Sequence, residues 1–165
     1  MNTDNRSDIK RAQISLSVDE WHEIALEGTK IPVTLKLNGE SMRPLIRKQR
    51  DSVTVIPVYR KLKKGDIVLF KRFDSAYVVH RVNKIDGQSV TTVGDNCTEF
   101  DAPMSICDVW GIVVKENRDG KILNLDSAVS RIYGRMRMFT RPVRSLWRKI
   151  KRFGASLIRR LEGGG

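Results

Sequence analysis

The chain has 165 residues, 40% of them hydrophobic, and a formal net charge of +12 at pH 7. This length fits one modest domain with a single core plus appendages, and it excludes two large domains. The charge is concentrated, because residues 131–165 hold eleven Lys or Arg and one acid, and this excludes a protein that is basic over its whole surface.

The N-terminal segment is polar and carries no targeting signal. Residues 1–14 are predicted to be disordered, and their start, MNTDNRSDIK, lacks the apolar core of a signal peptide. No stretch of the chain reaches the roughly 20 apolar residues that span a bilayer. We therefore expect a cytoplasmic protein without a transmembrane helix.

A short helix and then a strand-rich domain are predicted over residues 15–127. Ser17 and Glu20 have the spacing of a capping box, and Gly28 is a plausible helix end. Seven runs rich in Val and Ile follow, at residues 31–37, 52–58, 66–70, 76–85, 88–93, 109–114 and 121–125. Asp86-Gly87 and Asp119-Gly120 predict hairpin turns. The fold class is therefore mainly β, a coiled antiparallel sheet or partly open barrel.

The C-terminal segment, residues 128–162, changes to a helical period. Apolar residues recur there at steps of three and four, with Arg and Lys mostly on other faces. Val129, Ile132, Tyr133 and Met136 begin the pattern, and Pro142 could start a second helix. We predict basic amphipathic helices, arranged as a helical hairpin or one bent helix.

Two cysteines and two histidines limit the possible chemistry. Cys97 and Cys107 form neither a CxxC pair nor a disulfide framework, so they are interpreted as structural thiols. No metal site and no cofactor is indicated. His22 lies on the first helix and is interpreted as a solvated surface ring. His80 lies in mid-strand, which makes it either a satisfied core histidine or a general base.

Ser41 lies in the stretch LNGESMRP at residues 37–44, directly after a predicted strand. The Gly and Pro of this stretch explain a turn without any function. A serine nucleophile would need an adjacent base, for which His80 is the candidate. Asp95 and Asp101, in a loop too polar to be core, could hold the Nδ1 proton of that ring, although Asp95 could instead form a simple Asx-turn.

Five short motifs occur in order along the chain: GESMRP (39–44), GDIVLF (65–70), VHRV (79–82), GDN (94–96) with Asp101 following, and VWGIV (109–113). Their combination resembles the type I signal peptidases, within their branch that uses a histidine base, as in the endoplasmic reticulum, archaeal and Gram-positive enzymes. The resemblance covers roughly residues 37–114, in the family's order. It implies a coiled β fold, which agrees with the strand pattern.

The resemblance also implies roles for four residues. Ser41 matches the nucleophile, His80 the general base, Asp101 the acid that orients the base, and Asp95 a supporting carboxylate. The implied reaction is cleavage of a signal or leader peptide through an acyl-enzyme. Gly39 departs from the pattern, because many members carry there a serine that helps to hold the oxyanion. The missing N-terminal membrane anchor is the largest departure.

The basic tail leaves the partner and the function open. An anionic membrane surface ranks first, ahead of packing on a protein and of nucleic acid. Binding to the inner face of the cell membrane would make a cytosolic leader peptide a reasonable substrate. The alternatives are a self-cleaving repressor-type regulatory peptidase, for which too few residues precede Ser41 to form a helix-turn-helix domain, or a catalytically inactive membrane-associated scaffold.

Overall fold

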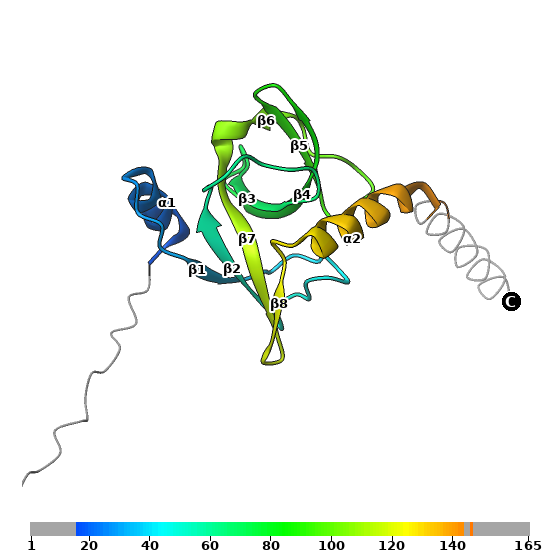
Figure 1. Cartoon of the computed structure of the whole chain (residues 1–165), viewed down its shortest axis with the longest axis horizontal. Coiled ribbons are helices and arrows are strands. Elements are labelled where there is room, and N and C mark those ends of the chain that lie inside the picture. Colours follow the sequence, from blue (N-terminus) through cyan, green and yellow to red (C-terminus); the bar gives the residue numbers. More distant parts are fainter. Residues whose placement is uncertain (1–15, 144–145, 147–165) are drawn as a thin grey trace, which may run out of the picture.

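The computed structural model describes residues 16–143 and 146. It confirms a mainly β fold, in which one antiparallel sheet curls into a half-barrel (Figure 1). Seven strands follow one another in the order β1-β2-β7-β3-β4-β5-β6, and β8 pairs with β7 beside this path. The predictions for residues 1–14, and for most of the second C-terminal helix, lie outside the described residues.

All seven predicted strands are present within this part of the chain, and the two-residue β6 was not predicted. The strands are β1 (Val33–Lys36), β2 (Ser52–Pro57), β3 (Ile67–Lys71), β4 (Tyr77–Asp86), β5 (Ser89–Val93), β6 (Met104–Ser105), β7 (Val109–Arg118) and β8 (Lys121–Asn124). The helices are α1 (Val18–Leu26), the short 3₁₀ helix η1 (Ile106–Asp108) and α2 (Ala128–Phe139). Both predicted hairpin turns are confirmed, with positive φ angles at Gly87 and Gly120.

α1 begins with the predicted capping box, in which Ser17 and Glu20 bond each other's backbone amides. It packs on the apolar core through Trp21, which is buried. The Nε1 of this ring donates to the carbonyl oxygen of Ile31 at 2.8 Å. Gly111 of β7 allows this approach, since a Cβ there would lie 3.0 Å from the Trp21 ring and 2.6 Å from Val55. The packing therefore requires a residue without a side chain at that position.

Two apolar clusters fill the two faces of the curled sheet. The larger contains Trp21, Met42, Ile46, Val53, Val55, Ile67, Leu69, Val79, Val113 and Leu125. The smaller contains Val68, Phe70, Val82, Val90 and Val109. Successive residues of β3 and β4 alternate between the clusters, as a strand buried on both faces requires.

α2 is capped by Ser127, whose hydroxyl accepts from the amide of Ser130. Figure 1 shows α2 beginning beside β7 and β8 and running away from the sheet toward its C-terminal end. Residues 141–143 and 146 are again helical. Within residues 16–143 and 146, no helix has the length and apolar character needed to cross a membrane.

Candidate active site

β4 places His80 against the smaller apolar cluster, opposite Val68 of β3. The ring is buried, with 7% of the residue exposed, and the edge of Phe70 faces it at 6.3 Å between centroids. His80 Nδ1 lies 2.6 Å from Asp101 Oδ2. Because a carboxylate accepts hydrogen bonds, Nδ1 keeps its proton when the ring is neutral, and Nε2 is then the nitrogen that can act as a base.

Asp101 is fixed by Thr92 of β5 at two points. The Thr92 hydroxyl donates to Asp101 Oδ2 at 2.6 Å, and the Asp101 amide donates to the Thr92 carbonyl at 2.9 Å. Thr92 itself is completely buried. A loop carboxylate is thus held by a rigid strand, and that strand pairs with the one that carries His80.

These contacts shift the pKa values of His80 and Asp101. Burial disfavours a charged His80 ring, but interactions with Asp101 and with Cys97 outweigh it and raise the His80 pKa to about 9. Burial likewise opposes the charge on Asp101, yet hydrogen bonds from His80 and Thr92 lower the pKa of that carboxyl. The pair at neutral pH is therefore an imidazolium next to a carboxylate.

Ser41 lies in the turn that follows β1, half-buried, and the next residues anchor that turn. Met42 and Ile46 are each 1% exposed within the larger apolar cluster. The Ser41 carbonyl accepts from the amide of Asn96 at 2.7 Å, which joins the turn to the loop that leads to Asp101. Gly94 permits this contact, because a Cβ there would lie 2.7 Å from the Ser41 carbonyl oxygen.

The structure thus brings together the segments of three predicted residues: the Ser41 turn, β4 with His80, and the loop with Asp101. The expected hydrogen bond between Asp101 and His80 is present. In the described part of the chain, no hydrogen bond joins Ser41 Oγ to the His80 ring.

Asp95 differs from its sequence-based interpretation as part of a polar loop outside the core. It is buried, and its two carboxylate oxygens accept from Arg81 Nε and Nη2 at 2.8 and 2.9 Å. Arg81 follows His80 in β4, so its side chain points to the opposite face of the strand. The Asp95 carboxylate therefore binds Arg81 on the face of β4 that is away from His80 and Asp101. This ion pair supports the loop that carries Asp95.

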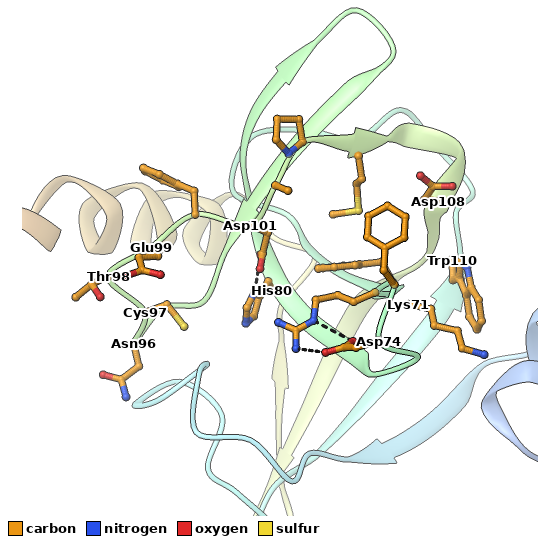
Figure 2. A pocket seen from close by; sticks show the side chains of 17 residues that line it. Lys71, Asp74, His80, Asn96, Cys97, Thr98, Glu99, Asp101, Asp108 and Trp110 are labelled. Carbon is orange, nitrogen blue, oxygen red and sulfur yellow. Dashed lines mark hydrogen bonds and ion pairs between the residues drawn. The ribbon is translucent and has the colours of Figure 1, made fainter.

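Two further sequence interpretations are corrected. Neither cysteine is a buried structural thiol: Cys107 is exposed, and Cys97 is half-buried in the loop next to His80 (Figure 2). His22 is not a free surface ring, because it stacks on Trp110 at 3.9 Å between centroids, and burial lowers its pKa. Helix and loop periodicity alone give no information on such contacts between distant segments.

A hollow of about 970 Å³ opens beside His80, and Cys97 and Asp101 are among the residues that line it (Figure 2). Its apolar lining comes from Phe70, Phe73, Phe100, Pro103, Met104 and Trp110. Five charged residues, Lys71, Arg72, Asp74, Glu99 and Asp108, line this trough as well, and Ser41 is not among its lining residues. The trough therefore offers both apolar and charged contacts to a peptide segment bound next to His80.

Among the described residues, no group of three or more His, Cys, Asp or Glu side chains could hold a metal ion. The chemistry that the site offers is therefore that of a hydroxyl, a thiol, an imidazole and a carboxylate. No protein-family model matches the chain, and the search of curated proteins gives no match.

Proposed function

We propose that the protein is a serine endopeptidase similar to the histidine-base type I signal peptidases, with Ser41 as nucleophile and His80 as general base. The contact of 2.6 Å between His80 Nδ1 and Asp101 Oδ2, beside the Ser41 turn, is the observation that best supports this proposal. The half-buried Asp101 carboxylate, itself bonded by Thr92, orients the His80 ring next to an open trough, as the acid of a serine peptidase orients its base.

In the proposed reaction, the neutral His80 ring removes the Ser41 hydroxyl proton through Nε2 as Oγ attacks the scissile carbonyl carbon. Asp101 keeps the Nδ1 proton in place and stabilises the imidazolium that forms. His80 then gives the proton to the leaving amine, and water, activated by the same ring, hydrolyses the acyl-enzyme. The backbone amide of Ser41 is one donor for the oxyanion.

The proposed reaction requires a hydrogen bond between Ser41 Oγ and His80 Nε2 that is not present among residues 16–143. Catalytic hydrogen bonds are often long in enzymes without substrate and shorten when the substrate binds. The substrate class that we propose is a signal or leader peptide, bound extended along the trough beside His80. The resemblance implies small residues immediately before the cleaved bond.

The test is cleavage of a panel of signal and leader peptides, followed by mass spectrometry, together with labelling by a fluorophosphonate probe, which phosphonylates a reactive serine and releases fluoride. Ser41→Ala should abolish cleavage and labelling. Ser52→Ala, in β2 and outside the site, is the matched control and should retain both. Equal cleavage by the wild type and Ser41→Ala would refute the proposal.

A catalytically inactive scaffold is the second candidate, and it is favoured by the lack of a hydrogen bond between Ser41 Oγ and His80 among residues 16–143. It predicts that the wild type cleaves no peptide and that Ser41 remains unlabelled although the domain is folded. The same experiment therefore distinguishes the two candidates.

A further inference from the structure

α2 packs on the sheet through its polar face. Ser130, Gly134 and Arg141 are buried on this side, and Gly134 lies directly against the Arg81 side chain. Arg137 Nη2 donates to the Asp95 carbonyl at 3.0 Å, and Arg141 donates to a carbonyl in the same loop. Basic and small residues, together with the half-buried Tyr133 ring against Arg81, thus attach this helix to its own domain.

The apolar face of the same segment is turned away from the domain. Six large apolar residues lie on it at alternating steps of three and four, and every one is at least 54% exposed. They are Val129, Ile132, Met136, Phe139, Val143 and Leu146. Amphipathic helices ordinarily turn such a stripe toward the core, so this reversed orientation indicates an apolar partner outside the domain.

A shallow hollow of about 720 Å³ borders this stripe. Met136, Met138 and Phe139 line it together with Lys64, Asn83 and Arg135. Neither Lys64 nor Arg135 has a carboxylate partner among the described residues. Two cations beside exposed apolar side chains match a molecule with an anionic head and an apolar body, which is the chemistry of an acidic phospholipid.

Charge distinguishes the possible occupants of the apolar face. Residues 131–165 carry a net +10, so two copies that met through this segment would repel each other. An anionic lipid surface attracts the same charge and accepts the apolar side chains at the headgroup boundary. We propose that the stripe from Val129 to Leu146 binds the surface of an anionic lipid bilayer, with the helix lying in the membrane plane.

The proposal has a consequence for the candidate active site, although it does not depend on peptidase activity. Arg137 also donates to the Arg43 carbonyl at 3.4 Å, so one side chain of α2 reaches both the Ser41 turn and the loop of Asp95. A helix held on a bilayer by its outer face therefore holds these two segments close to the lipid surface by its inner face.

The experiment is co-sedimentation of the full chain with vesicles of phosphatidylcholine containing phosphatidylglycerol, and with vesicles of phosphatidylcholine alone. Met136→Glu combined with Phe139→Glu should weaken partitioning onto the anionic vesicles by about tenfold or more, since each side chain loses its apolar burial. Ile122→Glu alters an equally exposed apolar residue of β8 and should bind as the wild type does. Circular dichroism checks that each variant remains folded.

Four results would overturn the proposal. The first is equal partitioning of the wild type and the double variant. The second is equal binding to neutral and anionic vesicles. The third is a dimer in sedimentation equilibrium that the double variant abolishes while the wild type binds no vesicles, since a second copy would then cover the stripe. Stronger binding to duplex DNA than to anionic vesicles would likewise identify the basic segment as a nucleic-acid contact.

Discussion

His80 and Asp101 are joined at 2.6 Å, and the Asp101 oxygen that faces the ring also accepts from the buried Thr92 hydroxyl. One carboxylate oxygen thus has two donors from two adjacent strands. The sheet, rather than the loop that carries Asp101, therefore sets the position of this oxygen. The His80 ring that faces the oxygen is held in place as well.

Replacing Asp101 tests this arrangement. Asp101→Asn removes the charge and can turn an amide N–H toward Nδ1, which favours the wrong tautomer of His80. We expect kcat/KM for peptide cleavage to fall by about 100- to 10,000-fold, the range of general-base contributions. Asp86→Asn, at an exposed hairpin position, is the control and should leave the rate unchanged. A similar loss in both variants would mean that Asp101 has no special role.

The raised pKa of His80 predicts an alkaline pH profile. The base must be neutral to accept a proton, and the pKa of about 9 keeps the ring protonated at pH 7. We expect kcat/KM to rise with pH up to about 9 and then to level off. Because Cys97 helps to raise the His80 pKa, Cys97→Ala should move the profile to lower pH. Cys107→Ala, at an exposed position, should not move it, and identical profiles for all three proteins would argue against the contact.

Gly39 marks a place where the oxyanion site can be strengthened. A Cβ at this residue would have only Ser41 Oγ near it, at 3.9 Å, so a serine fits without displacement. Since removal of one oxyanion donor costs about 100- to 1,000-fold in kcat, adding one should give a gain, which we expect to be about tenfold for Gly39→Ser. Gly39→Ala adds the carbon without the hydroxyl and serves as control. Equal rates for the two variants would exclude an oxyanion role for this position.

Gly134 is predicted to be essential for the docking of α2. A Cβ there would lie 2.3 Å from Arg81 Cδ, and Arg81 cannot move because it is fully buried and bonded to Asp95 and to the Gly65 carbonyl. Gly134→Ala should lower the free energy of unfolding by about 1–3 kcal/mol, as overpacking does, despite the better helix propensity of alanine. Urea denaturation measures the change. Arg135→Ala, exposed on the same helix, should have a small effect, and a Gly134→Ala variant as stable as the wild type would contradict the prediction.

Local patterns predicted most of the sheet, because strand alternation and the two Asp-Gly turns are encoded within a few residues. They also placed His80 on the same strand face as Val82. The hairpin register pairs Val82 with Thr92. The sequence of this hairpin alone could therefore have predicted that Thr92 lies near the His80 ring. The partner of Asp95 could not be predicted in this way, since the pairing with Arg81 depends on how a loop folds over the opposite face.

The orientation of α2 illustrates a different limit. Its periodicity predicted a helix with one apolar face, and the helix is confirmed over residues 128–139. Periodicity does not tell which face meets the domain. That choice depends on Arg81, which occupies the space beneath Gly134, and on main-chain carbonyls in distant loops that accept from Arg137.

The contacts of α2 can form only late in the synthesis of the chain. A ribosome makes the Ser41 turn, then β4, then the loop with Asp101, and only afterwards Arg137 and Arg141, which donate to carbonyls of the turn and of the loop. A nascent chain therefore contains every reactive side chain of the site before it contains the side chains that tie the turn and the loop together. For an enzyme of the proposed class, this order postpones a fully assembled site until α2 has been made after the β domain.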